Sequence, residues 1–261
     1  MEYHCETRTP RSRSIIVDPF KYTTIGHTHM KLCSPLSASR CDTLVDFLAL
    51  PNPQSVLDIA CGKAELSIRV LEQTHGTGVA VDMNPSFLAC ARAEAQQRLH
   101  TDALHCVECD ASTYTPDQPA DLVMCVGARP YGNRKENLAR LRTFAADDGR
   151  ILVGEGYWRS APPSEFVDFL GESEEDAAIR FHDLIDIGAE LGLHCVHAFE
   201  TTAEELDRYD GFYAATIEQY IRDHPEDADV DAMQQRVRGW REPFLRYGRD
   251  VMGFGWYIFN A

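Results

Sequence analysis

Two acids and a run of small residues are spaced as in a nucleotide-binding site. Asp58 lies within residues 56–59, a short apolar run that is typical of a buried parallel strand, and Asp82 ends the next such run. Between them, small residues at 60–62 predict a tight turn before a helix. Strand, turn, helix, strand and terminal acid make one nucleotide-binding βαβ unit, in which the last acid can hold two ribose hydroxyls.

The residues of the turn distinguish between classes of nucleotide. A dinucleotide-binding fold favours G-x-G-x-x-G, with a helix N-terminus directed at a pyrophosphate, whereas residues 60–64 read A-C-G-K-A. Asp58 would repel a pyrophosphate but could hold an ammonium group. A ligand with a ribose at one end and an α-amino acid at the other fits Asp58 and Asp82 together. S-adenosylmethionine is such a ligand.

At this turn the chain resembles the class I S-adenosylmethionine-dependent methyltransferases, whose first motif is D-x-G-x-G-x-G. Ala60 and Ala64 replace two of the three glycines, and Gly62 remains. Later segments are similar to a bacterial family of this class with G-E-P-Y-W after strand five and W-D-R-Y in a cap; here Gly156 replaces the proline and Leu206 the tryptophan. The resemblance covers most of residues 20–261 and implies a reaction class without a substrate.

The resemblance implies a cofactor site at the turn and at the ends of the next strands. The residues it assigns to the cofactor are Asp58, Ala60, Cys61, Gly62, Asp82, Met83, Asp110, Ala111 and Cys125. Met83 would lie against the adenine, Asp110 or its neighbouring backbone would reach the adenine amino group, and Cys125 would lie beneath the sulfonium. S-adenosylhomocysteine would be the product.

Strands that alternate with helices predict an α/β fold with a doubly wound parallel sheet. Asn84 and Pro85 are suited to the N-cap and first position of one helix, and another is expected over residues 133–146. The resemblance implies a Rossmann-like, seven-stranded mixed sheet with helices on both faces and helical cap segments. Its last strand would lie antiparallel between strands five and six. The strands are expected at residues 56–59, 78–81, 104–109, 121–126, 150–153, 194–199 and 255–259.

Two segments fall outside the alternation and are predicted to cover the carboxyl ends of the strands, where they would exclude water from methyl transfer. The predicted division is a flexible tail at 1–14, an N-terminal helical cap or lid at 15–50, a cofactor-binding core at 51–200, a helical cap insertion at 201–250 and a final core strand at 251–261.

The candidate catalytic bases are His27, His29 and Glu155. On an extended segment the i, i+2 spacing of the two histidines would place both rings on one side, but no third or fourth ligand is near, so a metal site is not expected. The candidate substrate contacts are Tyr131, Trp158 and Tyr209. Packing within the cap is the alternative role for Trp158 and for the aromatic stripe that includes Tyr209.

Composition limits the partners. The formal net charge of −16 disfavours nucleic acid, and no apolar run approaches membrane-spanning length. Nine cysteines without an export signal predict free thiols in a reducing, cytoplasmic compartment. Methyl transfer to a small molecule with a nitrogen, oxygen or sulfur nucleophile is therefore expected, with the acceptor and the oligomeric state open. The alternatives are a non-catalytic S-adenosylmethionine-binding partner protein and a nicotinamide-dependent oxidoreductase. Asp58 argues against the oxidoreductase, because its charge would repel the pyrophosphate of a nicotinamide cofactor.

Overall fold

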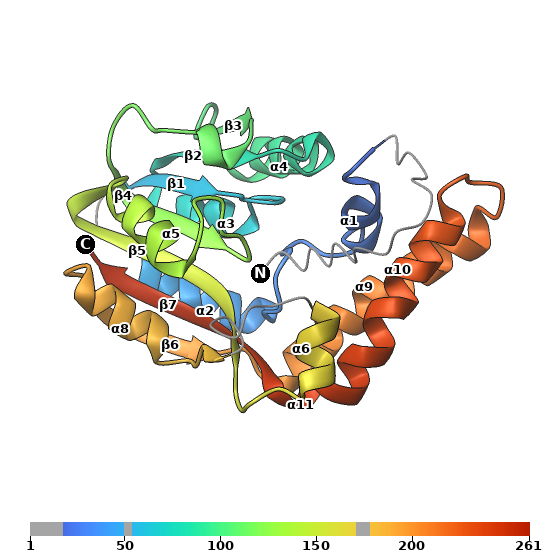
Figure 1. Cartoon of the computed structure of the whole chain (residues 1–261). Helices are drawn as coiled ribbons and strands as arrows, with labels where there is room; N and C mark the ends of the chain where they lie inside the picture. The colour runs from blue at the N-terminus through green and yellow to red at the C-terminus, as the bar shows by residue number, and fades with distance from the viewer. Residues whose placement is uncertain (1–17, 50–53, 171–177) are drawn as a thin grey trace.

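The computed structural model describes residues 18–49, 54–170 and 178–261, so the predicted tail at 1–14 lies outside it. Its centre is a seven-stranded sheet in the order β3-β2-β1-β4-β5-β7-β6 (Figure 1). The strands are β1 Ser55–Ile59, β2 Thr77–Asp82, β3 Leu104–Glu108, β4 Ala120–Val126, β5 Ala145–Trp158, β6 His194–Glu200 and β7 Met252–Asn260.

The sheet is mixed, as predicted. β1 pairs in parallel with β2 and with β4, and β7 lies antiparallel between β5 and β6. The strand order reverses between β1 and β4, because the chain runs outward to β3 and then returns to the other side of β1. In open α/β sheets a ligand binds at such a reversal, outside the carboxyl ends of the strands.

Helices cover both faces of the sheet. Asn84 caps α4 by accepting hydrogen bonds from the amides of Ser86 and Phe87, and Pro85 opens that helix, as predicted. The helices are α1 Lys21–Gly26, α2 Ala38–Leu48, α3 Glu65–Thr74, α4 Pro85–Arg98, α5 Arg134–Arg142, α6 Ser164–Leu170, α8 Asp183–Glu190, α9 Ala203–Asp223, α10 Val230–Pro243 and α11 Arg249–Val251, with a 3₁₀ turn η1 at Ala111–Thr113 and a π turn η2 at Phe244–Gly248.

Alternate residues of β5 reach two separate cores, as expected for a strand that is covered on both faces. Val153 packs in a cluster with Leu138 of α5 and Leu184 of α8. Leu152 packs in a second cluster with Leu44 of α2 and residues of α3. Both clusters hold the strand ends in place at the edge where β1 and β4 finish.

The predicted N-terminal cap at 15–50 divides into two parts. Its second half, α2, buries Cys41, Leu44 and Leu48 on the sheet and so belongs to the layer that covers it. Its first half, α1, packs instead on α9 and α10 through Tyr22 and their apolar side chains. Figure 1 shows α1, α9 and α10 on the side to which the arrow of β1 points.

Strand β5 is longer than predicted at both ends. The helix expected at 133–146 ends at Arg142, because Ala145 already pairs with Ala120 of β4. At the other end β5 continues to Trp158, paired with Met252 of β7. Glu155 and Trp158, which the sequence suggested would follow strand five, therefore lie within it.

Candidate cofactor and acceptor site

The turn after β1 has an unusual backbone. Ala60, Gly62 and Ala64 have φ angles of 56°, 57° and 55°, in the left-handed region that favours glycine. A Cβ on Gly62 would also lie 3.2 Å from Sγ of Cys33. The turn thus keeps the backbone path of a glycine-rich loop, although two alanines occupy it.

Asp82 fastens this turn to the end of β2. Its Oδ2 accepts a hydrogen bond from the amide of Gly62 at 2.8 Å, and its Oδ1 accepts one from the amide of Asn84 at 2.8 Å. The side chain is 9% exposed. A carboxylate that two backbone amides hold in place therefore stands beside the turn.

Asp58 lies deeper, on β1. Its Oδ2 accepts a hydrogen bond from Oγ of Ser67 at 2.6 Å. Burial raises the pKa of Asp58 to about 7; the hydrogen bond from Ser67 opposes this shift and the nearby charge of Asp82 adds to it. Near neutral pH this acid can hold or release a proton.

The other residues assigned to the cofactor lie at the same edge of the sheet. Met83 is 49% exposed, which is unusual for a large apolar side chain and suits an open contact surface. Asp110 is exposed and caps η1 through the amide of Ser112, whose hydrogen bonds lower the pKa of Asp110. Ala111 is buried, and Cys125 is buried with its thiol near the carbonyl of Ala128. Their contacts with a cofactor stay predictions.

Residues 27–36, between α1 and α2, form a cover segment over the turn. Nζ of Lys63 donates to the carbonyls of His27 at 2.6 Å and Met30 at 2.8 Å. The Cys33 side chain lies against Gly62, and the Oγ of Ser34 lies 3.9 Å from where a Cβ of Gly127 would stand. The cover segment therefore meets the ends of both β1 and β4.

A hydrogen bond between His27 and Tyr209 joins α9 to the start of the cover segment. Nδ1 of His27 donates to the carbonyl of Thr23 at 2.8 Å, so Nε2 has a free lone pair and accepts from the Tyr209 hydroxyl at 2.8 Å. Burial, with a smaller contribution from the charge of Lys63, lowers the pKa of His27 to about 4. The imidazole is therefore neutral near pH 7.

The structure separates the other candidate catalytic residues from this pair. His29 is exposed, because residues 27–29 form a turn rather than the extended segment that the spacing suggested. Glu155 is buried, and its Oε2 lies 3.1 Å from Nε of Arg134. No sequence pattern indicates this ion pair, since the two residues lie on different elements.

Two of the three candidate substrate residues pack against aromatic neighbours. Trp158 is 1% exposed and meets the ring of Phe166 edge-on, in the packing role that the sequence also allowed. Tyr131 is half-buried, with its ring edge-on to Phe144 at 5.8 Å. Tyr209 alone of the three touches the cover segment, and a role in substrate binding stays a prediction for each.

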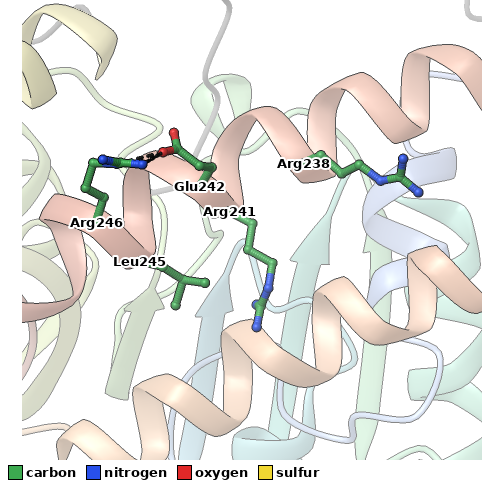
Figure 2. A pocket seen from close by; sticks show the side chains of 5 residues that line it. All are labelled: Arg238, Arg241, Glu242, Leu245 and Arg246. Carbon is green, nitrogen blue, oxygen red and sulfur yellow. Dashed lines mark hydrogen bonds and ion pairs between the residues drawn. The ribbon is translucent and has the colours of Figure 1, made fainter.

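A shallow groove of about 580 Å³ lies elsewhere, on α10 and η2 (Figure 2). Three arginines line it, but each is already paired with an acid. Arg246 pairs with Glu242, as Figure 2 shows, and the other pairs are Arg238 with Glu218 and Arg241 with Asp210. Because acids neutralise these arginines, the groove is a weak anion site. The turn after β1 is therefore the better candidate for a ligand-binding site.

Comparison with known proteins identifies the segment that carries the turn. Residues 56–149 match the family model of a methyltransferase domain. This segment is a methyltransferase domain. The match runs from β1 to the start of β5 and so includes Asp58, Gly62 and Asp82.

Relatives extend the likeness over most of the chain. The uncharacterised protein YjhP of Escherichia coli is 25% identical over 242 residues, which cover 90% of this chain and 95% of YjhP. A methyltransferase of Geobacter sulfurreducens, solved with S-adenosylhomocysteine, has a TM-score of 0.84 at 23% identity and covers 92% of this chain and 97% of its own. A methyltransferase of Thiobacillus denitrificans, solved with the same compound, has a TM-score of 0.83 at 21% identity over 92% and 97%. The chain has the fold of the class I S-adenosylmethionine-dependent methyltransferases, as the resemblance implied.

Two further observations concern metal ions and membranes. In the described ranges, His182, Asp183 and Asp186 could together hold a metal ion, but they are largely exposed on the first turn of α8, where Asp183 accepts from the amide of Arg180. None of the described helices is long and apolar enough to cross a membrane.

Proposed function

We propose that the protein transfers the methyl group of S-adenosylmethionine to a small organic acceptor with a nitrogen, oxygen or sulfur nucleophile. The observation that carries this proposal is the anchored turn: Asp82 holds the amide of Gly62, and Cys33 of the cover segment lies against Gly62. Two structural relatives that were solved with S-adenosylhomocysteine support the choice of cofactor.

Each part of the site suits one part of this cofactor. The fixed carboxylate of Asp82 suits the two ribose hydroxyls, and the exposed side chain of Met83 suits the adenine face. Asp58, buried on β1 just before the turn, suits the ammonium group of the amino-acid end. The sulfonium methyl is already activated, so the main task of the protein is to hold the nucleophile in line with it and to exclude water.

His27 and Tyr209 are proposed to accept the proton of the acceptor. A nucleophile that donates to the Tyr209 oxygen can lose its proton there, while the Tyr209 hydroxyl passes its own proton to the lone pair of His27 Nε2. The low pKa of His27 keeps this lone pair available at neutral pH. An acceptor amine or phenol would need this help more than a thiol, which is partly ionised near neutral pH.

Transfer of labelled methyl groups tests the proposal. Wild-type protein is incubated with methyl-tritiated S-adenosylmethionine and sets of amines, phenols and thiols, and the labelled products are counted. We expect Tyr209→Phe to lower kcat by about 100-fold or more while it leaves the Kd of S-adenosylhomocysteine within about twofold. Tyr220→Phe is the matched control, because Tyr220 lies on the same helix and donates to Asp227 away from the cover segment.

Two results would count against parts of this proposal. If Tyr209→Phe keeps its turnover, the proton-accepting role of the pair is wrong. If S-adenosylhomocysteine binds but no acceptor is methylated, a non-catalytic binding protein becomes the better account. The net charge of −16 makes nucleic acid an unfavourable acceptor, which the same assay can check with RNA and DNA.

A further inference from the structure

Helix α1 connects the helical insertion with the helix that follows Asp82. It has six residues and no side-chain hydrogen bond at its N-cap, so it depends on tertiary contacts for its stability. Toward the insertion, a Cβ on Gly26 would lie 2.3 Å from the ring of Tyr213, which shows how closely α1 and α9 approach. Thr24 and His27, in turn, contact the first turn of α4.

Asn84 makes the hydrogen bond between α4 and α1. Its Nδ2 donates to Oγ1 of Thr24 at 3.0 Å, and Asn84 is 2% exposed. The orientation of this amide is fixed, because its Oδ1 accepts hydrogen bonds from the backbone amides of Ser86 and Phe87 at the start of α4. A buried amide donor is costly without a partner, so Thr24 is held at a defined place beside α4.

The backbone of Asn84 is also bound to the proposed ribose contact. Its amide donates to Oδ1 of Asp82 at 2.8 Å, so one residue is hydrogen-bonded both to this carboxylate and to α1. Helix α1 continues the connection, because Nδ1 and the backbone amide of His27 both donate to the carbonyl of Thr23, at 2.8 and 3.1 Å. Two hydrogen bonds and a single helical turn therefore connect Asp82 with the imidazole that faces Tyr209.

A second contact between α4 and the end of α1 acts on the imidazole itself. The ring of Phe87 meets the ring of His27 edge-on, with centroids 5.6 Å apart and an interplanar angle of 88°. Tyr213 of α9 also meets the His27 ring edge-on, at 5.1 Å. With two ring contacts and a hydrogen bond at each nitrogen, His27 has little freedom to turn, and its place depends on where α1 docks on α4.

We propose that Asn84 and Thr24 are positioning residues, whose hydrogen bond sets the place of His27. The proton-accepting pair that His27 forms with Tyr209 is thereby aligned with a cofactor bound at Asp82. This inference rests on the proposed function and adds to it two residues that act through His27. A displacement of about 1 Å can cost a reaction about 100-fold in rate, so the hydrogen bond should matter for kcat more than for cofactor affinity.

Hydrogen exchange with S-adenosylhomocysteine tests the inference on the full-length protein. In wild-type protein the ligand, at about 100 times its Kd, should slow exchange by about 10-fold or more at the amide of His27 and at the turn 60–63. Thr24→Val keeps the shape of the side chain but removes its hydroxyl. It should reduce the slowing at His27 to about twofold or less and leave the slowing at the turn. Thr24→Ser keeps the hydroxyl and should keep both.

Turnover gives a second readout, which a general loss of stability would not produce. With an acceptor that the methyl-transfer assay identifies, Thr24→Val should lower kcat by about 10- to 100-fold and leave the KM of S-adenosylmethionine within about twofold. Thr24→Ser should restore most of kcat. An equal loss in both parameters would mean that the hydrogen bond serves cofactor binding instead of positioning, which contradicts the inference.

Thr28→Val is the matched control, because the Thr28 hydroxyl is exposed and donates to the carbonyl of Thr24 one turn earlier instead of to α4. Circular dichroism checks that each variant is folded. If Thr24→Val keeps the slowing at His27, or loses it equally at the turn, the inference is wrong while the proposed function stands. If wild-type protein does not bind S-adenosylhomocysteine, the proposed function fails and this inference fails with it.

Discussion

At the scale of single residues, the proposed ribose contact depends on Asp82. Both of its oxygens are held by backbone amides, of Gly62 and of Asn84, so the carboxylate cannot turn away from the edge of the sheet. Fixed acceptors of this kind bind a diol without a further loss of side-chain entropy. The same two hydrogen bonds also hold the turn, so Asp82 joins the fold to the proposed binding site.

Replacement of Asp82 tests its contact with the ribose. Asp82→Ala should weaken the binding of S-adenosylhomocysteine by about 1.5–3 kcal/mol, the scale of a charge-assisted hydrogen bond. Titration calorimetry gives the Kd, and circular dichroism confirms folding. Asp117→Ala, an exposed acid just before β4, removes the same charge far from the turn and should change little. An unchanged Kd in folded Asp82→Ala would refute this role.

Asp58 should make the stability of the ligand-free protein depend on pH. Its pKa of about 7 in the folded chain lies above its usual value of 3.8, so the folded state binds more protons between these values. Its contribution to the free energy of unfolding is therefore fully present below about pH 4 and is lost as the pH rises toward 7, by a few kcal/mol at most.

Urea unfolding from pH 4 to pH 8 measures this contribution. Asp58→Asn keeps an acceptor for Ser67 but cannot ionise, so its advantage in stability over wild-type protein should grow as the pH rises. Taking the difference between the two proteins removes the groups that titrate alike in both. Two parallel curves would mean that Asp58 has an ordinary pKa.

Local sequence predicted the residues of the turn well but not the pairs formed across the chain. Asp58, Gly62 and Asp82 belong to one βαβ unit, whose pattern is contained in a single short stretch. The hydrogen bond between His27 and Tyr209 joins residues 182 positions apart, so only tertiary packing creates it. The sequence suggested both residues separately. No clear sequence pattern predicted the backbone turn that separates His29 from His27.

At the scale of elements, the alanines of the turn after β1 carry strain. A left-handed backbone costs a non-glycine residue about 1–2 kcal/mol in the folded state. Glycine removes this cost, but its greater backbone freedom also stabilises the unfolded state and so offsets part of the gain. Ala60→Gly should therefore raise the free energy of unfolding by about 0.5–1 kcal/mol. Ala64→Gly relieves the same strain but removes a buried methyl group that packs on Ala80 and Ala91, so its net effect should be near zero.

Urea denaturation of both variants measures these effects without any ligand. The comparison separates backbone strain from packing, because φ is nearly equal at the two positions while Ala60 is more exposed than Ala64. Equal destabilisation by both substitutions would mean that the turn is not strained.

The cover segment should become more protected when the cofactor binds. Hydrogen exchange with S-adenosylhomocysteine should slow at residues 27–36, at the turn 60–63 and near Tyr209 on α9, because a ligand held between these parts stabilises all of them. Helix α8, which packs against α5 and β6, is the internal control. Protection of the turn alone would place the acceptor pocket elsewhere.

The sequence predicted the elements better than the layers in which they lie. The order of strands and helices, and the antiparallel last strand that the resemblance implied, agree with the structure. The extent of β5 was underestimated because Gly154 and Gly156 interrupt its apolar pattern. An amphipathic pattern shows that α2 has a buried face, but it does not show whether the sheet or a cap buries that face.

At the scale of the whole molecule, α1 joins the N-terminal segment to the helical insertion. Nζ of Lys21 lies 2.7 Å from carboxylate oxygens of both Asp227 and Asp229, at the turn between α9 and α10. Tyr22 packs into the same cluster as Ile217 and Met233. We therefore expect α1, α9 and α10 to act as one unit that carries the cover segment over the sheet.

The central claim is that the turn binds S-adenosylmethionine rather than a dinucleotide. Calorimetric titration of the full-length protein with S-adenosylhomocysteine and, separately, with NAD tests it most directly. We predict that S-adenosylhomocysteine binds at one site per chain and raises the melting temperature, because a ligand of the folded state alone stabilises that state, and that NAD does neither. Binding of NAD without binding of S-adenosylhomocysteine would contradict the account.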